Sequence, residues 1–158
     1  MDIYIATAAC EGSTELSAFD ACLSEVGIGD LNLLYLSSVI PNEARLLLQH
    51  APTEHGQWGD RCYCVMAQCR TSVIGHEAWA GIAWVREHET GRGLFAEAHG
   101  ASEAEVRLQL RETLEDMTRR RSCMSWEPIE TRLAGVTCTG TPVCAIATAV
   151  YTTESFGA

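Results

Sequence analysis

Short apolar segments dominate the chain and predict β-strands. In residues 3–8, isoleucines and a β-branched threonine alternate with a tyrosine and alanines, the period of a strand. Further apolar runs, separated by turns that contain glycine or proline, predict strands at residues 31–36, 44–49, 62–73, 79–85, 94–98, 129–138 and 143–151. Most of the chain is therefore expected to lie in β-structure.

Two other segments repeat their apolar residues at helical spacing. The first, residues 15–26, follows Gly12-Ser13-Thr14, which breaks the preceding strand and offers a hydroxyl cap. The second runs from about residue 103 to 120 and begins with a capping box formed by Ser102 and Glu105. The expected buried stripes are Leu16, Phe19, Leu23 and Val26 in the first helix, and Val106, Leu110, Leu114 and Met117 in the second.

This combination of elements predicts an α+β fold. Two one-faced helices and many strands cannot bury all of their apolar faces in one layer, so we expect an antiparallel α+β sandwich. The 158 residues are 47% hydrophobic and 20% charged, which is typical of a globular protein. We find no internal repeat, linker or low-complexity segment, and residues 1–158 are therefore expected to form a single domain.

The charge balance and the length of the apolar runs argue against two classes of partner. The net charge is −10, and the run Arg119-Arg120-Arg121 closes a predicted helix, where the helix dipole favours cations. Without a basic stripe that could neutralise phosphates, nucleic-acid binding is not expected. No apolar run approaches the length needed to cross a bilayer, so we expect no membrane partner.

Eight cysteines raise the question of disulfides or a metal. The N-terminus has neither a basic start nor a long apolar core, so we expect a cytoplasmic protein with reduced, mostly buried thiols. A cysteine-based metal binder is the alternative, and its best case is Cys62, Cys64 and Cys69. Their spacing does not match paired zinc knuckles, and in a strand Cys69 faces away from the other two. We therefore predict no metal site.

The segment from Leu31 to Glu43 contains the most suggestive pattern. Its first six residues are almost all apolar or aromatic, which predicts a central strand buried on both faces. Ser37 and Ser38 follow, and Pro41 cannot donate to a sheet, so the serines are expected where regular strand pairing stops. The ordinary explanation of such a pair is that its hydroxyls bond their own backbone at the end of a strand.

Five segments together resemble the pyruvoyl-dependent arginine decarboxylases. The similarity is dense over residues 11–21, 27–33 and 36–44, and it continues at residues 93–100, where that family has a catalytic glutamate strand, and at residues 144–147. The resemblance implies a four-layer αββα sandwich with antiparallel sheets. It also implies a homotrimer with active sites between the protomers.

The resemblance implies that the chain cleaves itself between Ser37 and Ser38. In a strained backbone the Ser38 hydroxyl can attack the Ser37 carbonyl, move the chain onto an ester and then eliminate. The resulting dehydroalanine hydrolyses to a pyruvoyl group, the expected covalent cofactor. Residues 1–37 would form the β chain and residues 38–158 the α chain.

The family's functional residues correspond to particular positions here. By resemblance, Asn32 assists processing with its amide and Glu97 protonates the substrate after carbon dioxide leaves. Asp20 receives the far end of the substrate, where a carboxylate suits a guanidinium. From the residues alone, Asp20 is as readily explained as a solvated acid on a helix, and Glu97 is better explained as an outward-facing glutamate on a strand. The remaining pocket positions by resemblance are Leu23, Gly29 and Leu31.

The function expected from the resemblance is decarboxylation of arginine to agmatine through a Schiff base with the pyruvoyl group. Acid resistance and polyamine supply are the associated physiological roles. A decarboxylase of another amino acid is the first alternative, because residues 50–90 and 131–142 fit the family poorly. A structural or regulatory homologue that never cleaves itself is the second.

Overall fold

The computed structural model describes residues 1–52 and 56–156, which contain two helices and nine strands. The helices are α1 (Glu15–Glu25) and α2 (Glu103–Arg119). The strands are β1 (Asp2–Glu11), β2 (Asn32–Tyr35), β3 (Val39–Ile40), β4 (Arg45–Leu47), β5 (Arg61–Thr71), β6 (Glu77–Arg86), β7 (Gly93–Gly100), β8 (Glu130–Thr137) and β9 (Val143–Glu154).

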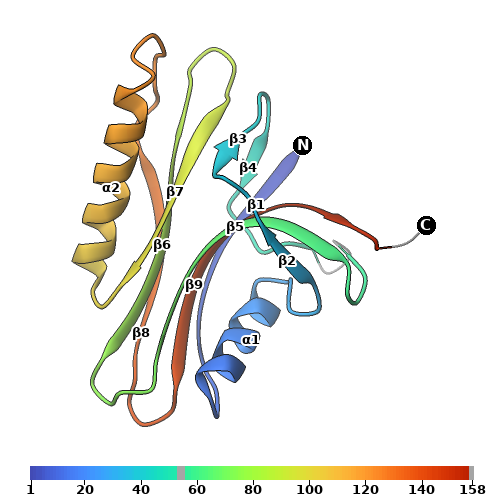
Figure 1. The fold of residues 1–158 in the computed structure, drawn as a ribbon, viewed down its shortest axis with the longest axis vertical. Coiled ribbons are helices and arrows are strands. Elements are labelled where there is room, and N and C mark those ends of the chain that lie inside the picture. Colours follow the sequence, from blue (N-terminus) through green and yellow to red (C-terminus); the bar gives the residue numbers. More distant parts are fainter. Residues whose placement is uncertain (53–55, 157–158) are drawn as a thin grey trace.

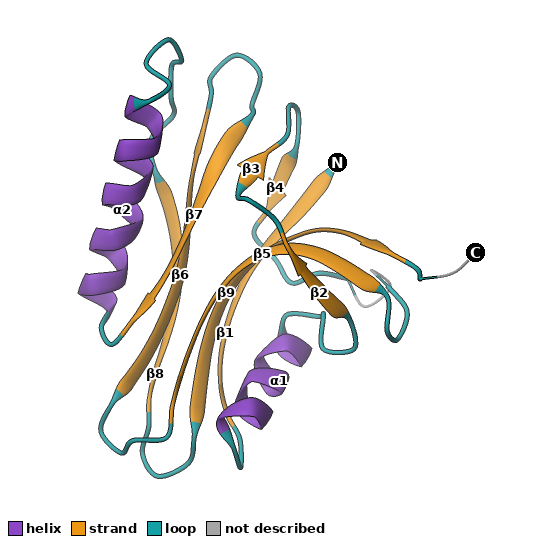
Figure 2. Ribbon diagram, in the orientation of Figure 1, coloured by secondary structure: helices purple, strands orange, loops and turns teal. Residues whose placement is uncertain are grey.

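The strands form two sheets that pack face to face, and one helix covers the outer face of each sheet (Figure 1, Figure 2). In the described residues the larger sheet has the order β2-β5-β9-β1-β4 and lies against α1, and the smaller has the order β3-β7-β6-β8 and lies against α2. The expected four-layer αββα sandwich is confirmed. Pairing is antiparallel except at the two edges of the larger sheet, where β2 runs parallel to β5 and β4 parallel to β1.

Three layers of buried side chains correspond to the three interfaces between these four layers. The layer between the sheets includes Ile5, Ile82 and Phe95. A second layer, with Ala18 and Cys22, lies between α1 and the larger sheet, and a third lies between α2 and the smaller sheet. Burial of apolar surface in three stacked layers explains why both helices show a single apolar stripe.

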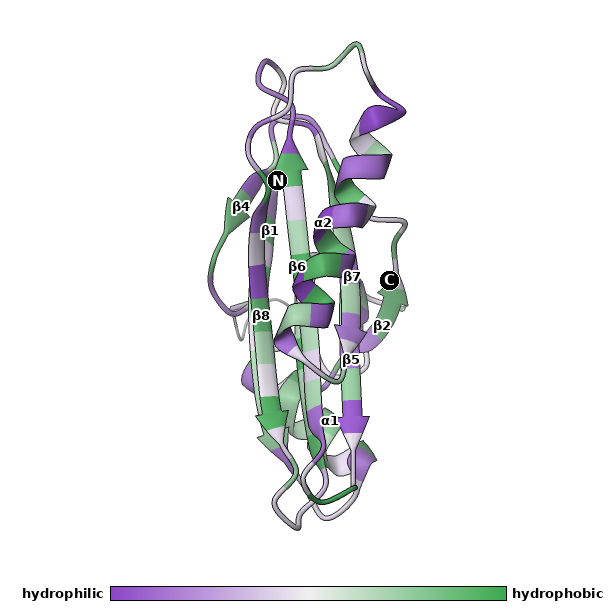
Figure 3. Cartoon of the chain, turned by 90° about the vertical axis from the view of Figure 1, so that its left-hand side faces the viewer, coloured by the Kyte–Doolittle hydropathy of each residue, from purple (hydrophilic) through white to green (hydrophobic). Residues whose placement is uncertain are grey.

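Helix α2 approaches its sheet closely because β6 has a glycine at the point of contact. A Cβ atom on Gly81 would lie 2.9 Å from side-chain atoms of both Val106 and Leu110. Figure 3 shows hydrophobic and hydrophilic positions alternating along α2, with a largely hydrophobic β6 behind it. The expected stripe of α2 is confirmed, with Met117 partly buried at its end.

Hydroxyl caps begin both helices, as expected. Thr14 accepts a hydrogen bond from the backbone N–H of Ser17, and Ser102 accepts one from that of Glu105. The Glu105 side chain, however, reaches back to the N–H of Ala101 rather than to that of the capping serine. The expected capping box of α2 is therefore displaced by one residue.

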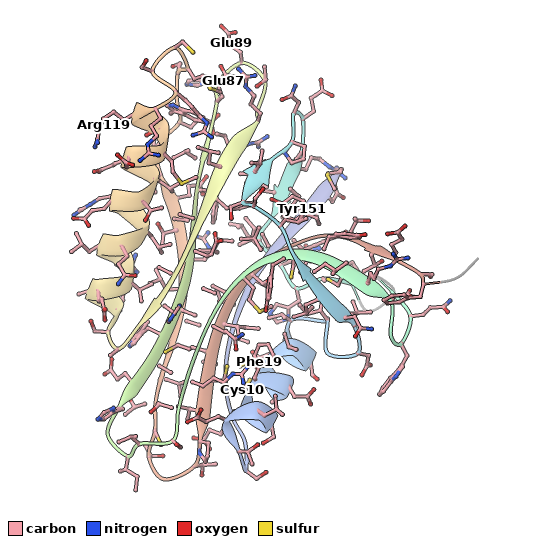
Figure 4. The ribbon with its side chains drawn as sticks, viewed as in Figure 1. Cys10, Phe19, Glu87, Glu89, Arg119 and Tyr151 are labelled. Atoms are coloured by element: carbon pink, nitrogen blue, oxygen red, sulfur yellow. The ribbon has the colours of Figure 1, made fainter. Side chains whose placement is uncertain are left out.

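The apolar stripe expected for α1 was wrong at its first residue. Leu16 is exposed, and the buried face is formed by Ala18, Cys22 and Leu23, with Phe19 partly buried beside it. Phe19 packs under the guanidinium of Arg70 on β5, 4.1 Å from the ring centroid, and Figure 4 labels it on the helix. A small alanine and cysteine face the sheet because α1 lies close against it.

The central position expected for residues 31–36 was also wrong. β2 is the edge strand of the larger sheet and pairs with β5 alone. Leu34, Tyr35 and Leu36 are exposed, Tyr35 by 59%. An apolar run has the same sequence pattern whether the strand is buried in a core or forms a surface that another molecule covers. The run therefore marks a strongly apolar edge rather than the middle of the sheet.

The structure also bears on the expectations about thiols, metal binding and membrane segments. All eight cysteines lie in the described residues with free thiols, and most are buried, although Cys123 is exposed. No group of three or more His, Cys, Asp and Glu residues within 1–52 and 56–156 is arranged to hold a metal ion. Neither helix in this part of the chain combines the length and apolar character needed to span a membrane.

Leu110→Ala is expected to destabilise the fold strongly, because Leu110 is 1% exposed and packs against β6. Truncation of a buried leucine typically costs about 2–5 kcal/mol. Leu108→Ala, in the same helix but 44% exposed, is the matched control and should change the free energy of unfolding by less than about 0.5 kcal/mol. Urea unfolding at one protein concentration measures both, and equal losses would contradict the assignment of the buried face.

Candidate active site

The chain turns between β2 and β3 at the serine pair. Ser37 is exposed, whereas Ser38 is buried, with 8% of its surface accessible. The backbone φ of Ser38 is 63°, in the left-handed region that residues with side chains rarely adopt. Such a conformation costs on the order of 1–3 kcal/mol and persists only where the surroundings enforce it. The turn therefore holds Ser38 under strain, where strand pairing was expected to stop.

Strand β7 enforces this conformation by binding the backbone on the C-terminal side of the turn. β3 pairs antiparallel with the start of β7. The N–H of Phe95 donates to the carbonyl oxygen of Ser38 at 2.8 Å. A Cβ atom on Gly93 would lie 2.2 Å from the carbonyl oxygen of Val85, so β7 begins at a glycine that permits this close pairing with β6.

The Ser38 hydroxyl donates to the carboxylate of Glu97. Its Oγ lies 2.8 Å from Oε1 and 2.9 Å from Oε2 of Glu97. Glu97 is two residues beyond Phe95 on β7, so both side chains point to the same face of the strand. The strand that binds the Ser38 carbonyl thus also places a proton acceptor against the Ser38 hydroxyl.

Glu97 also faces a small cavity of about 230 Å³ between the sheets. Although Glu97 remains accessible from solvent, partial burial raises the pKa of its carboxyl above the ordinary value, and the hydrogen bond from Ser38 opposes this by lowering the pKa. The cavity is lined by Tyr35, Met66, Ala67, Gln68, Glu97 and His99.

Two residues of this cavity had no role in the sequence analysis. Tyr35 comes from β2 and Gln68 from β5, which pair in parallel, and both line this cavity together with Glu97. His99, also without an expected role, lies one strand period beyond Glu97 on the same face. The alternation of β7 was the available signal for His99, but only the pairing of the sheets identifies the other two.

The expected substrate-binding residues lie together, but away from Ser38. Asp20 is exposed on α1, and Leu23 belongs to the core beneath that helix. Gly29 and Leu31 line a separate cavity of about 220 Å³ together with Ser24 and other residues of the turn after α1. A Cβ atom on Gly29 would lie 2.5 Å from Ser24 Oγ, so a larger residue would disturb this wall.

Asn32 belongs to this second group and not to the serine pair of its own chain. Its Nδ2 donates to the carbonyl oxygen of Gly59 at 2.6 Å. Three residue steps separate Asn32 from Tyr35 along β2, about 10 Å at the rise of a strand, and Ser37 lies two residues further. Within one chain, the structure brings together Ser38 and Glu97 and leaves Asn32 at the opposite end of β2.

A sequence model of one protein family matches nearly the whole chain. The family is described as pyruvoyl-dependent arginine decarboxylase, and the match covers residues 2–156. The chain belongs to this family. A pyruvoyl-dependent arginine decarboxylase of Thermococcus kodakarensis is 30% identical over 161 residues, which cover 93% of this chain and 92% of that protein.

Two further comparisons cover less of the chain. A pyruvoyl-dependent arginine decarboxylase of Methanothermobacter thermautotrophicus is 45% identical over 47 residues, so the aligned segment spans 30% of this chain and 31% of that protein's length. A solved structure of a pyruvoyl-dependent histidine decarboxylase aligns with 17% identity and a TM-score of 0.43. This alignment covers 57% of this chain and 49% of the histidine decarboxylase chain.

In this family member, the Glu97 carboxyl of the Ser38→Ala variant is expected to have a pKa above its ordinary value. The hydroxyl stabilises the carboxylate by donating to it, so Ser38→Ala leaves burial as the dominant influence and favours the protonated form. A carbon-13 NMR titration of Ser38→Ala, with Glu97→Gln to assign the carboxyl signal, measures the value. The expected pKa is above the ordinary 4.5, and a value at or below 4.5 would contradict the described environment.

Proposed function

We propose that the protein is a self-processing pyruvoyl-dependent decarboxylase that converts arginine to agmatine and carbon dioxide. Membership of the family supports the reaction class. The observation that carries the proposal is the contact between Ser38 Oγ and the Glu97 carboxylate in a buried, strained turn. A serine that only ended a strand would require neither the left-handed backbone nor a carboxylate against its hydroxyl.

Self-cleavage would use the groups that the turn already holds. Glu97 accepts the proton of the Ser38 hydroxyl as Oγ bonds to the Ser37 carbonyl carbon and the peptide bond to the Ser38 nitrogen breaks. Loss of the Ser38 α-proton then breaks the bond between Cβ and Oγ and releases the Ser37 carboxylate. One water is consumed and one ammonia released, leaving chains of residues 1–37 and 38–158.

The surroundings of Ser38 fit a pyruvoyl group. The position is buried, its carbonyl oxygen already accepts a hydrogen bond from Phe95, and a carboxyl lies beside its side chain. When formed, the group would supply a ketone that binds the substrate's amine and withdraws electrons from its α-carbon. Phe95 would hold the adjacent carbonyl. Glu97, with a raised pKa, would carry the proton that the α-carbon takes up once carbon dioxide has left.

We further propose that a neighbouring copy of the chain completes each site. Asp20 offers a carboxylate to the arginine guanidinium, but in one chain it lies on α1, away from Ser38. The exposed apolar residues Leu34, Tyr35 and Leu36 lie between the two groups of site residues and provide a surface that a second copy could cover. The homotrimer implied by the resemblance would join Ser38 of one protomer to the Asp20 and Asn32 of the next.

Two further assignments follow from this function. The free thiols of all eight cysteines, each within the described residues, suit a reducing compartment, and we propose a cytoplasmic location. Decarboxylation consumes a proton and yields agmatine, so polyamine supply and acid resistance are the proposed roles of the product and the reaction.

The test is release of carbon dioxide from carboxyl-labelled arginine, with lysine, ornithine and histidine as competing substrates. We expect activity on arginine and none for Ser38→Ala. Asp20→Asn should raise KM for arginine about 10- to 100-fold, because it weakens charge-assisted hydrogen bonds of about 1.5–3 kcal/mol. Equal activity on lysine, or an unchanged KM in Asp20→Asn, would contradict recognition of the guanidinium by Asp20.

Mixed assemblies test the sharing of sites between protomers. If Ser38 and Asp20 of one site come from different chains, co-expression of Ser38→Ala with Asp20→Asn should restore wild-type KM at about a quarter of the interfaces by random assembly. If each site were built within one chain, every chain in the mixture would lack one of the two residues. No low-KM activity would then appear, and the shared site would be excluded.

A further inference from the structure

A β-bulge on β9 sets Tyr151 apart from its neighbours. Thr152 pairs with Tyr63 of β5, but Val150 pairs with the next residue, Cys64, so Tyr151 is an extra residue with no partner in the ladder. Bulges re-aim side chains and are common beside active sites. Tyr151 is 6% exposed, and its side chain enters the apolar layer between the two sheets.

The bulge directs the Tyr151 hydroxyl to the strand that follows Ser38. The hydroxyl donates to the carbonyl oxygen of Val39 on β3 at 2.9 Å, and Tyr151 is labelled in Figure 4. Its ring packs edge-on against Phe95, with 6.2 Å between centroids. β3 is the edge of the smaller sheet, so a carbonyl pointing away from β7 has no strand to bond it. Tyr151 supplies that missing donor from the opposite sheet.

Two consecutive carbonyls are therefore held from different sheets. Phe95 on β7 binds the Ser38 carbonyl and Tyr151 on β9 binds the Val39 carbonyl. Together they fix the two successive peptide planes on either side of Val39, immediately after the left-handed φ of Ser38. Burial, together with the nearby charge of Glu97, raises the pKa of Tyr151, so its hydroxyl remains a donor across the physiological range.

We propose that Tyr151 is a positioning residue for self-cleavage. Its hydroxyl holds the Val39-Ile40 peptide while Phe95 holds the Ser38-Val39 peptide, so that Ser38 stays in the strained conformation from which Oγ reaches the Ser37 carbonyl carbon. This inference rests on the proposed self-cleavage. In the step concerned, a bond from Oγ to carbon forms as the bond from carbon to nitrogen breaks, Glu97 takes the hydroxyl proton, and the released Ser38 nitrogen gains a proton.

Tyr151→Phe tests this directly, since it keeps the ring against Phe95 and removes only the donor to Val39. Cleavage of freshly translated chain, followed over time by denaturing gel and intact mass, should slow about ten-fold, the effect of losing one buried hydrogen bond. Tyr63→Phe is the matched control. It removes the hydroxyl that donates to Glu154 at 2.7 Å, opposite the same bulge, and should cleave at the wild-type rate.

If Tyr151 only stabilised the fold, other destabilising substitutions would also slow cleavage. The positioning role predicts the opposite: Leu110→Ala removes a larger buried contact far from the turn and should still cleave at the wild-type rate well below its unfolding temperature. Slow cleavage in Leu110→Ala as well as in Tyr151→Phe would assign the effect to lost stability and overturn the proposal. The tryptophan bands of the near-ultraviolet circular dichroism, compared between Ser38→Ala and Ser38→Ala/Tyr151→Phe, report whether Trp84 still packs against Phe95, and their loss would also overturn the proposal.

Hydroxylamine separates the first step from the later ones. It cleaves the ester and would leave residues 38–158 beginning with serine. If Tyr151 positions the first attack, hydroxylamine should not restore the wild-type rate of chain scission to Tyr151→Phe, and restoration would overturn the proposal. Wild-type cleavage with an equally fast Tyr151→Phe would contradict the positioning role alone. A wild type that never cleaves would instead contradict the proposed function.

Discussion

The structure depends on the attachment of one strained residue to the edge of a sheet. Ser38 adopts a left-handed backbone that an isolated chain would leave, and the hydrogen bond from the Phe95 N–H to its carbonyl opposes that relaxation. Phe95 is itself fully buried between the sheets, so the register of β7 is set by the core. The same register brings Glu97 to the Ser38 hydroxyl. Apolar packing between the sheets therefore fixes the relative positions of these two reactive groups.

The site residues fall into two groups at opposite ends of β2, and this separation has a physical reason. Ser38 and Glu97 belong to the edge where β3 meets β7, whereas Gly29 and Leu31 line the turn after α1. The strand between them is short, carries exposed apolar side chains and pairs on one side only. An apolar edge of this kind is poorly suited to water and well suited to contact with another copy of the chain.

Local patterns in the sequence predicted the parts of the fold that local forces decide. Apolar spacing and hydroxyl caps placed both helices to within about one residue at their ends, and alternation identified the long strands. The order of the strands within each sheet was harder to predict from the sequence. The apolar run before Ser37 was expected at the centre of the fold and lies at an edge, because periodicity reports burial and does not distinguish a core from an interface. The bulge that aims Tyr151 arises from pairing with β5, about 90 residues earlier, and leaves no local trace.

The central claim is that Ser38 becomes the cofactor by cleaving the chain before it, and intact mass under denaturing conditions tests this most directly. The account predicts that the wild-type protein yields two polypeptides, residues 1–37 and residues 38–158, the second bearing a pyruvoyl group in place of Ser38. Ser38→Ala should give one full-length species. A wild-type protein that keeps a single full-length mass after prolonged incubation would contradict the account.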